Sequence, residues 1–298
     1  MKAIQTGQGS AFVRALGMLY PKEKRLFEDP YSEKLLMPFF KILLALMRSP
    51  KRFDRIMKSR ERSHRGEFGW LLCRTRYIDD VLKNIVEEKQ NEAVVNLGVG
   101  MDCRAYYIPG MESMRYFEVD HPSVIKTKRK RLKKVLGELP DYATFVPIDF
   151  ERQSFDTELK AAGYNLRSET FFLWEGVTQY ISKQANDSTL RYVAQASPGS
   201  KILFTYVLKG FIEGKEIPEG TEGTYKTFCR KNPLWIFGLD PVELTTYLSK
   251  YSLSLIEDIG SDQVKERYLK SGNLDLQVLE IERIALCEVN GQGVLNGP

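Results

Sequence analysis

Residues 93–100 read AVVNLGVG, so that a five-residue apolar run, Ala93–Leu97, leads directly into Gly98-Val99-Gly100. A short run of this kind, stopped by glycines, is typical of a strand that is buried on both faces of a sheet. Glycine has no Cβ, which allows a sharp backbone turn and the close approach of a ligand. Alone, the pattern fits an ordinary strand-to-helix turn equally well, so its meaning depends on the segments after it in the chain.

Four more apolar runs of strand length come after this segment, at Arg115–Val119, Thr144–Ile148, Thr170–Trp174 and Lys201–Val207. Helix-compatible segments lie between them, at Ser123–Leu136, Phe155–Ala162 and Lys183–Gln195. This alternation of strands and helices indicates a parallel sheet with helices on both faces. Pro147 lies inside the third strand and predicts that this strand is short or irregular.

The remaining segments complete the predicted architecture. Arg74–Glu88 has the apolar stripe of an amphipathic helix, a further helix is expected at Pro241–Lys250, and two closing strands at Ser252–Asp258 and Leu279–Val289. We therefore predict an α/β fold with a doubly wound, mostly parallel, seven-stranded, Rossmann-like sheet in a domain of residues 71–290. Helical cap elements are expected at residues 1–70 and in an insertion around residues 208–240. Residues 291–298 are expected to be a flexible tail.

The composition is that of a globular protein with a sizeable core, since 43% of its 298 residues are hydrophobic and 28% are charged. The most apolar stretch, Met37–Met47, is too short to span a bilayer and contains Lys41, so we interpret it as a buried helix face. The N-terminal segment lacks the apolar core and cleavage site of a signal peptide. We therefore expect a soluble, cytoplasmic protein.

Cysteines and charge argue against several other classes of protein. The four cysteines, Cys73, Cys103, Cys229 and Cys287, are scattered without a CxxC pair, so we expect neither a metal site nor a redox dithiol. The net charge of +5 is mild, and much of the excess lies in Lys126–Lys134, KTKRKRLKK. We interpret this run as the solvated face of a helix, because no aromatic residues are interleaved with it. We expect neither nucleic acid nor a membrane as a partner.

The chemistry is expected where the predicted parallel strands end, because ligands of open α/β sheets bind outside the carboxyl ends of the strands. The residues at these ends are Gly98, Gly100, Asp120, Asp149, Phe150 and Glu175. Asp120 follows the glycines by about 20 residues, the spacing at which an acid accepts hydrogen bonds from a ribose. The sequence thus favours an adenosine-containing ligand.

Two classes of ligand share this pattern. An NAD(P)-dependent oxidoreductase requires Gly or Ala at the sixth position of its fingerprint, where this chain has Cys103. A methionine sulfonium has no pyrophosphate, so that S-adenosylmethionine does not require the third glycine. Asp149 could accept from the adenine amine and Phe150 could cover the ring, although Asp149 could equally be a helix N-cap. Glu175 could bind the ammonium group, face the substrate or simply cap a turn.

Taken together, five segments resemble the leucine carboxyl methyltransferase superfamily, which also contains bacterial polyketide O-methyltransferases. They cover roughly residues 70–205, whereas residues 1–70 hardly match. The segments are Arg74–Asp80 (RTRYIDD), Val95–Tyr106 (VNLGVGMDCRAY), Phe117–Pro122 (FEVDHP), Val146–Phe150 (VPIDF) and Trp174–Ile181 (WEGVTQYI). The resemblance implies a methyltransferase dependent on S-adenosyl-L-methionine.

The resemblance also implies a role for each matching residue. Gly98 and Gly100 would form the loop under the methionine moiety, Asp120 would hold the ribose, Asp149 and Phe150 would border the adenine, and Glu175 would line the cleft. Either Arg74 or Arg76 would meet the cofactor carboxylate, because the guanidinium fork binds a carboxylate in a bidentate manner. Cys103 and Gln179 depart from the residues usual in the family, which leaves the substrate open.

We expect O-methylation of a carboxylate on a small-molecule or peptidic acid, because an ionised carboxylate needs no general base and the chain has only two histidines, His64 and His121. A phenol or hydroxyl acceptor is the nearest variant, with Glu175 or Tyr180 assisting proton removal. Arg104 and Tyr206 are further candidate substrate contacts. A protein that binds the cofactor without catalysis remains an alternative, as does the oxidoreductase.

Overall fold

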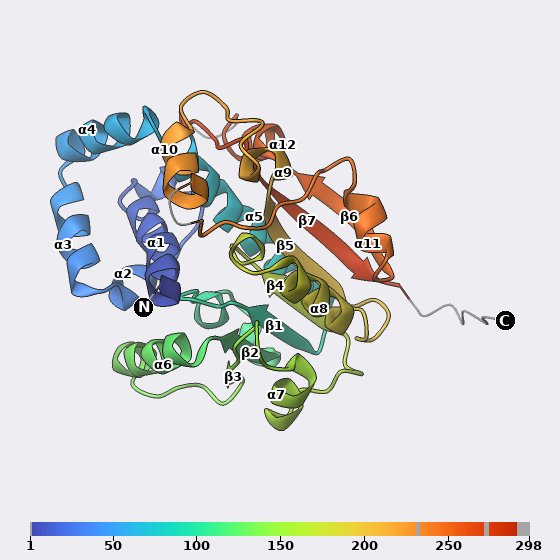
Figure 1. Cartoon of the computed structure of the whole chain (residues 1–298). Coiled ribbons are helices and arrows are strands. Elements are labelled where there is room, and N and C mark those ends of the chain that lie inside the picture. The colour runs from blue at the N-terminus through green and yellow to red at the C-terminus, as the bar shows by residue number, and fades with distance from the viewer. Residues whose placement is uncertain (1, 231–232, 271–273, 291–298) are drawn as a thin grey trace.

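The computed structural model describes residues 2–230, 233–270 and 274–290, so the predicted tail at 291–298 lies outside the described residues. Its centre is a seven-stranded sheet in the order β3-β2-β1-β4-β5-β7-β6, in which β7 alone runs antiparallel to its neighbours (Figure 1). The strands are β1 (Ala93–Leu97), β2 (Arg115–Asp120), β3 (Ala143–Pro147), β4 (Thr170–Trp174), β5 (Lys201–Val207), β6 (Leu253–Ile259) and β7 (Glu282–Val289). The predicted fold class is confirmed.

Helices flank the sheet and precede it along the chain. The longer ones are α1 (Lys2–Gly17), α3 (Pro38–Met47), α4 (Pro50–Glu61), α5 (Glu67–Glu88), α6 (Pro122–Leu136), α7 (Phe155–Ala161), α8 (Lys183–Val193), α11 (Leu244–Ser249) and α12 (Ser261–Tyr268). The short ones are α2 (Ser32–Leu35), α9 (Lys209–Ile212) and α10 (Glu222–Tyr225). Short 3-10 turns lie at Lys22–Lys24, Arg104–Tyr106, Met111–Ser113 and Thr178–Tyr180, and one π-helical turn at Lys226–Arg230. Helix α5 crosses the domain boundary expected at residue 70.

The strands are apolar on both faces because each face is covered by helices. Val94, Phe171 and Leu203 belong to a core cluster that includes residues of α5 and α12. Their chain neighbours point to the opposite face, where Val95 and Phe172 belong to a cluster with residues of α7, α8 and α11. Successive side chains of a strand alternate between faces, so uniformly apolar runs are what a doubly covered sheet requires.

Strand β3 is short, as predicted, but it is regular. It pairs with β2 from Ala143 opposite Tyr116 to Pro147 opposite Asp120. Proline has no N–H to donate, and it is tolerated here because β3 lies at the edge of the sheet and Pro147 is its last residue. The prediction of a short or irregular strand is therefore confirmed in one of its two alternatives, the short strand.

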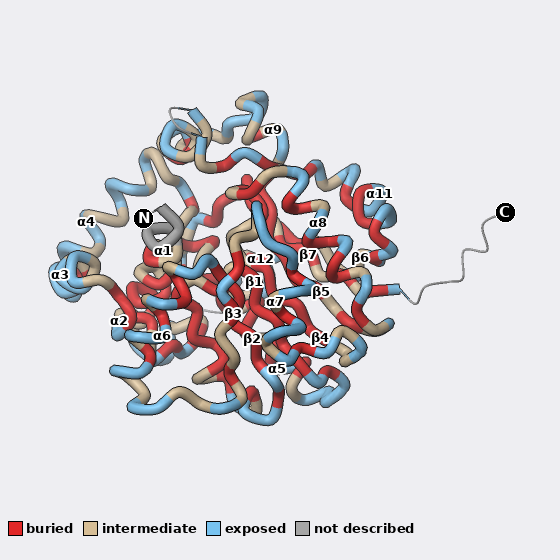
Figure 2. Tube along the Cα trace, turned by 60° about the horizontal axis from the view of Figure 1, so that its bottom comes forward, coloured by how far each residue is buried: buried red, intermediate tan, exposed pale blue. Residues whose placement is uncertain are grey.

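Helices α1 to α4 form a cap beyond the sheet, with α3 and α4 at the outer edge of the molecule (Figure 1). Leu44 and Met47 of α3 are buried, but Phe39, Ile42 and Leu46 are 69%, 64% and 47% exposed. Figure 2 shows this outer helix largely exposed, whereas the strands are buried. The interpretation of Met37–Met47 as a buried helix face is correct for one side only, because a second apolar stripe of the same helix is exposed.

Candidate active site

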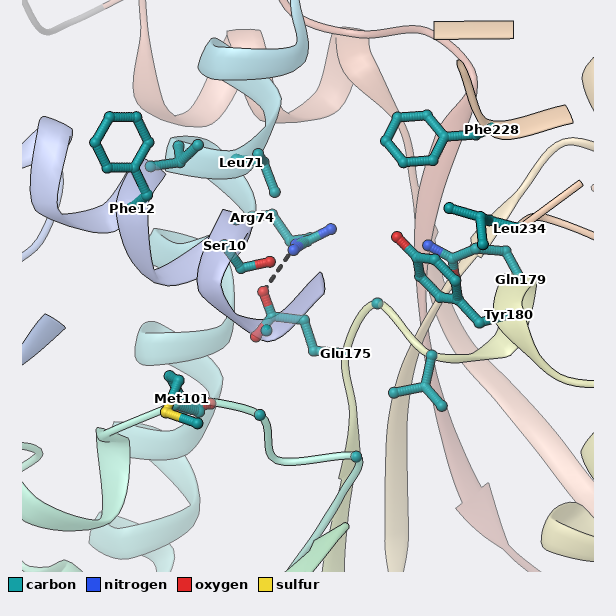
Figure 3. A pocket seen from close by; sticks show the side chains of 18 of the residues that line it. Ser10, Phe12, Leu71, Arg74, Met101, Glu175, Gln179, Tyr180, Phe228 and Leu234 are labelled. Atoms are coloured by element: carbon teal, nitrogen blue, oxygen red, sulfur yellow. Dashed lines mark hydrogen bonds and ion pairs between the residues drawn. The ribbon is translucent and has the colours of Figure 1, made fainter. Parts of the chain in front are cut away.

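A cavity of about 960 Å³ lies at the carboxyl ends of the parallel strands. Residues that follow β1, β2, β3 and β4 line its floor. Helices α1, α3, α4 and α5 line its walls, together with Phe228 and residues 233–236. Figure 3 shows Arg74 and Glu175 together in this cavity, with Phe12 and Leu71 on one side and Phe228 and Leu234 on the other. The strand-end rule thus locates the cavity correctly.

The turn after β1 favours glycine at positions 98 and 100. Gly98 and Gly100 have φ angles of +72° and +50°, in the left-handed region that side chains other than glycine's rarely adopt. A Cβ on Gly98 would lie 2.2 Å from Cγ2 of Val177. A Cβ on Gly100 would lie 3.3 Å from the Cα of Gly7 in α1. The turn is therefore a close backbone approach between β1, the loop after β4, and α1.

Asp120 ends β2 and holds this turn in place. Its Oδ2 accepts a hydrogen bond of 2.7 Å from the backbone N–H of Gly100, and its Oδ1 one of 2.6 Å from that of His121. Burial raises the pKa of Asp120, and the two N–H donors oppose that rise. Each oxygen keeps a further lone pair that could accept from a hydroxyl, and Asp120 lines the cavity.

Asp149 and Phe150 follow β3 on the same floor. Asp149 is not a helix N-cap, because α7 begins six residues later with Ser154 as its N-cap. Its Oδ1 accepts from the backbone N–H of Glu151 at 3.1 Å, which makes a local turn. Phe150 is half-buried and stacks on Phe155 with a centroid distance of 5.2 Å. A carboxylate and an aromatic ring therefore border the same part of the cavity.

Glu175 directly follows β4 and is held by two arginines. Its Oε1 accepts from Nε of Arg74 at 2.8 Å, and its Oε2 accepts from Nη1 of Arg104 at 2.6 Å. Arg74 also donates from Nη1 to Glu282 of β7 at 2.5 Å. Burial alone would raise the pKa of Glu175, but Arg104 and Arg74 outweigh burial and lower it. Glu175 is thus a fixed carboxylate, and only one predicted arginine, Arg74, reaches the cavity.

Arg76 points elsewhere. Its side chain leaves α5 on another face of the helix than that of Arg74, and it pairs with Asp80 at 2.8 Å and with the carbonyl of Leu26. Two other candidates also lie outside the cavity lining. Tyr206 donates its hydroxyl hydrogen to Asp258 at 3.1 Å, and His64 contacts Ser63. The structure does not bring these three residues to the site.

Arg104 is completely buried and is a structural centre of the floor rather than a free substrate contact. It pairs with Asp79 at 2.7 Å, with Asp102 at 2.6 Å and with Glu175. Burial raises the pKa of Asp79 to about 6 in spite of Arg104. Three carboxylates on one guanidinium give the floor its rigidity, because losing one partner would leave a buried charge unpaired.

Tyr180, Gln179 and His121 lie on the cavity wall. Burial raises the pKa of Tyr180 to about 12, so its hydroxyl stays protonated at neutral pH. Gln179 is buried beside the turn that follows β4. The imidazole of His121 accepts from the backbone N–H of Ser123 and caps α6, in keeping with its interpretation as a loop residue.

Sequence reasoning missed the contribution of α1. Ser10, Phe12 and Arg14 line the cavity, and Arg14 donates to the carbonyl of Met101 at 2.9 Å and pairs with Asp29 at 3.1 Å. No local motif marks this helix, because its contact with Met101 joins residues that are 87 positions apart in the chain. Glu282 was also missed, because it lies on an antiparallel strand and the strand-end rule applies to parallel strands.

The floor carries more negative than positive charge. Among the residues that line this polar part, carboxylates outnumber guanidinium groups: Asp102, Asp120, Asp149, Glu151, Glu175 and Glu282 against Arg14 and Arg74. Such a surface attracts a cation. S-adenosyl-L-methionine carries a sulfonium and an ammonium cation beside its single carboxylate. The glycine turn leaves room for such a ligand to lie close to the backbone. The residues present therefore fit this cofactor.

The outer half of the cavity is apolar. Phe12, Leu43, Ile56, Leu71 and Trp235 are among its lining residues. Two charged residues of this half, Arg60 and Glu67, form an ion pair with each other, with 2.8 Å between Nη2 and Oε2. An acceptor molecule in this half would thus contact hydrocarbon on most sides, while its reacting end faces the polar floor.

The comparisons with known proteins agree with this geometry. The sequence profile described as leucine carboxyl methyltransferase matches residues 8–194. The match begins in α1, so the expectation that residues 1–70 hardly share the resemblance is wrong. Among the described helices, none is long and apolar enough to cross a membrane.

Two bacterial relatives are described as S-adenosyl-L-methionine-dependent methyltransferases. YktD of Bacillus subtilis is 28% identical over 214 residues, covering 70% of this chain and 69% of the relative. A Streptomyces coelicolor protein is 29% identical over 209 residues, covering 70% of each chain. The crystal structure of a methyltransferase from Thermobifida fusca aligns with a TM-score of 0.58 at 11% identity and covers 88% of this chain and 93% of that chain. That likeness concerns the fold.

Proposed function

The chain belongs to the leucine carboxyl methyltransferase family, and from this premise we propose that it methylates the carboxylate of an apolar small-molecule or peptidic acid. The enzyme is a methyltransferase that uses S-adenosyl-L-methionine. This membership decides against the dinucleotide oxidoreductase as the alternative.

The proposed cofactor contacts follow the cavity floor. Asp120 would accept from the ribose hydroxyls, and Asp149 with Phe150 would border the adenine. Gly98 and Gly100 would let the methionine moiety lie against the backbone, and Arg74 would pair with its carboxylate. Glu175 would present its charge to the ammonium end while Arg104 holds it from behind. When bound, the cofactor supplies a methyl group already activated by the adjacent sulfonium charge.

The observation that carries the choice of acceptor is the lack of a competent base in the two residues expected to assist. Glu175 is fixed between Arg74 and Arg104 with a lowered pKa, which makes it a poor proton acceptor. Tyr180 keeps its proton at neutral pH because its pKa is raised to about 12. A carboxylate acceptor is already ionised and needs neither of them, whereas an alcohol or phenol would need one.

The protein's task is then mainly alignment. An oriented pair of reactants gains a large effective concentration, so rigid walls contribute to the rate without proton transfer. The ion pairs of Arg104 fix the floor, and the apolar walls exclude water from the reacting end. The negative carboxylate and the positive sulfonium lose charge together, which a dry cavity favours.

The test uses methyl-labelled S-adenosyl-L-methionine with the purified enzyme and a panel of aliphatic and aromatic acids, alcohols and phenols. We expect label in the acids, and release of that label as volatile methanol on treatment with base, because esters are hydrolysed and ethers are not. The Asp120→Asn variant serves as the control for enzyme-dependent transfer. Label that is found in phenols or alcohols and resists base would overturn the proposed acceptor.

A further inference from the structure

Helix α3 carries two neighbouring apolar stripes, and only one of them has a partner within the described residues. Phe40, Leu43 and Met47 line the cavity. In the other stripe Phe39, Ile42 and Leu46 are exposed, at the i, i+3 and i+7 spacing of a single helical stripe. A monomeric protein seldom leaves three large apolar side chains in one row exposed to water, so the stripe points to a binding surface.

The next helix, α4, is strongly basic on its exposed side. Lys51, Arg55, Lys58 and Arg62 are exposed at the i, i+4, i+7 and i+11 spacing of one face. Among the described residues, none of these four takes part in an ion pair, whereas Arg60 of the same helix pairs with Glu67. Helices α3 and α4 are consecutive and in contact, and together they form the outer edge of the cap (Figure 1).

An apolar helical stripe beside a row of unpaired cations matches the surface of an anionic phospholipid bilayer. Apolar side chains enter the boundary between headgroups and acyl chains, and lysines and arginines attract the anionic headgroups. We propose that α3 and α4 form a docking surface for such a bilayer. The occupant is the lipid surface itself, which combines an apolar boundary with anionic headgroups.

A second copy of the chain fits the surface less well. A symmetric pairing through α3 would bring the two basic rows of α4 toward each other, and like charges in apposition disfavour association. Anionic lipid supplies the opposite charge and covers the apolar stripe at once. The sequence predicts no membrane partner, because its pattern shows that α3 is apolar but not that one side of it faces outward.

The docking surface also bears on the acceptor, and this step rests on the proposed function. The same helix presents Phe39, Ile42 and Leu46 to the outside and Phe40, Leu43 and Met47 to the cavity. Helix α3 therefore borders both the exposed stripe and the apolar half of the cavity. The acceptor would be a lipid-soluble acid that enters from the bilayer, and not a water-soluble peptide.

The test is flotation of the purified full-length chain with vesicles, without cofactor or acceptor. We expect the protein to float with vesicles of phosphatidylglycerol and phosphatidylcholine, and not with phosphatidylcholine alone. Replacing the apolar stripe, Phe39→Ser, Ile42→Ser and Leu46→Ser together, should weaken binding by about 30-fold or more. Reversing the charges, Lys51→Glu, Arg55→Glu and Lys58→Glu, should abolish the preference for anionic vesicles.

The matched control replaces two exposed apolar residues outside the cap, Val242→Ser and Ile256→Ser, which are 90% and 50% exposed in the wild type. It should bind vesicles as the wild type does. An equal loss in control and stripe variants, or no flotation of the wild type, would overturn the docking surface. So would a wild-type dimer that the stripe variant converts to monomer in sedimentation. None of these outcomes touches methyl transfer, so the proposed function is judged separately by its base-labile product.

Discussion

At the scale of single residues, Asp120 combines two tasks that a sequence pattern reports as one. Its carboxylate accepts from the N–H groups of Gly100 and His121, which fixes the glycine turn, and the same residue lines the cavity. A neutral amide in its place would keep the size but supply only one acceptor oxygen. The position is therefore sensitive to charge as well as to shape.

Replacing Asp120 with Asn should weaken binding of S-adenosylhomocysteine by about 10- to 100-fold, the range expected for losing hydrogen bonds to a charged acceptor. Calorimetric titration measures this change. The control is Asp141→Asn, an exposed residue in the loop before β3, which should bind as the wild type does. Unchanged affinity in the Asp120→Asn variant would remove this residue from the cofactor site.

The two arginines of α5 give a second residue-scale prediction. Lysine cannot reproduce the bidentate fork, so Arg74→Lys should weaken S-adenosylhomocysteine binding by about tenfold or more. Arg76→Lys is the matched control and should stay within about twofold of the wild type, because Arg76 points to Asp80 and Leu26. The assignment fails if the Arg76 variant loses more affinity than the Arg74 variant.

Asp79 predicts a particular dependence of stability on pH. Its folded pKa is raised to about 6 by burial against the pull of Arg104, while an unfolded aspartate has a pKa of about 3.9. Between these values the folded state holds a proton that the unfolded state has lost, so rising pH reduces the free energy of unfolding. The loss from this one group is about 3 kcal/mol across that window.

The variant Asp79→Asn cannot titrate at this position. Urea unfolding of wild type and variant at several pH values measures their free energies of unfolding. As pH rises from about 4 to about 6.5, the wild type should lose up to about 3 kcal/mol of stability relative to the variant. The comparison removes the contributions of other carboxylates, which both proteins share. A difference that is constant with pH would mean that Asp79 does not titrate in this window.

At the scale of elements, α1 closes the cofactor half of the cavity by packing its glycine against the turn after β1. A Cβ on Gly7 would lie 3.1 Å from the Cα of Gly100, whereas a Cβ on Gly9 would meet nothing within 4 Å. Both residues lie in the helix, so alanine at either position raises helix propensity by about 1 kcal/mol. The two positions thus differ in the contact and not in the helix.

Gly7→Ala should push α1 away from the glycine turn and weaken S-adenosylhomocysteine binding by about fivefold or more, as crowding of a packed contact does. Gly9→Ala is the matched control and should bind like the wild type with an equal or higher melting temperature. Calorimetric titration and thermal unfolding of the two variants measure both effects. Equal affinities would show that α1 does not govern the site.

The elements also show what the sequence can and cannot predict. Strands β1, β2 and β4 were predictable because both their faces are buried. Burial on both faces requires consecutive apolar residues, as in Ala93–Leu97. Asp120 and Glu175 could be placed at the site because parallel strands end at one edge. The role of α1 could not, since Arg14 reaches Met101 across 87 residues of chain and no local pattern records that contact.

The outward side of α3 was unpredictable for a related reason. Phe39 and Phe40 have the same apolar character in the sequence, yet one is exposed and the other lines the cavity. Only the tertiary position of the helix at the edge of the cap separates them. A composition-based interpretation treats an apolar helix as buried, and an uncovered side appears only in the structure.

At the scale of the whole molecule, one cavity is made from parts that lie far apart along the chain. Helix α1 comes from the first residues, the floor from residues 96–181, and the outer wall from Phe228 and residues 233–236. The polar floor and the apolar outer half share this space. We propose that S-adenosyl-L-methionine occupies the floor of this cavity and contacts α1 and the strand-end segments at the same time.

Hydrogen–deuterium exchange with and without S-adenosylhomocysteine tests that claim most directly, because a ligand slows exchange in the segments it orders. We expect protection in residues 7–16, 96–104, 118–122, 148–151 and 174–181 together, with α11 and α12 unchanged. Protection that spares α1 and the strand-end segments, or that appears instead around α11 and α12, would contradict the account.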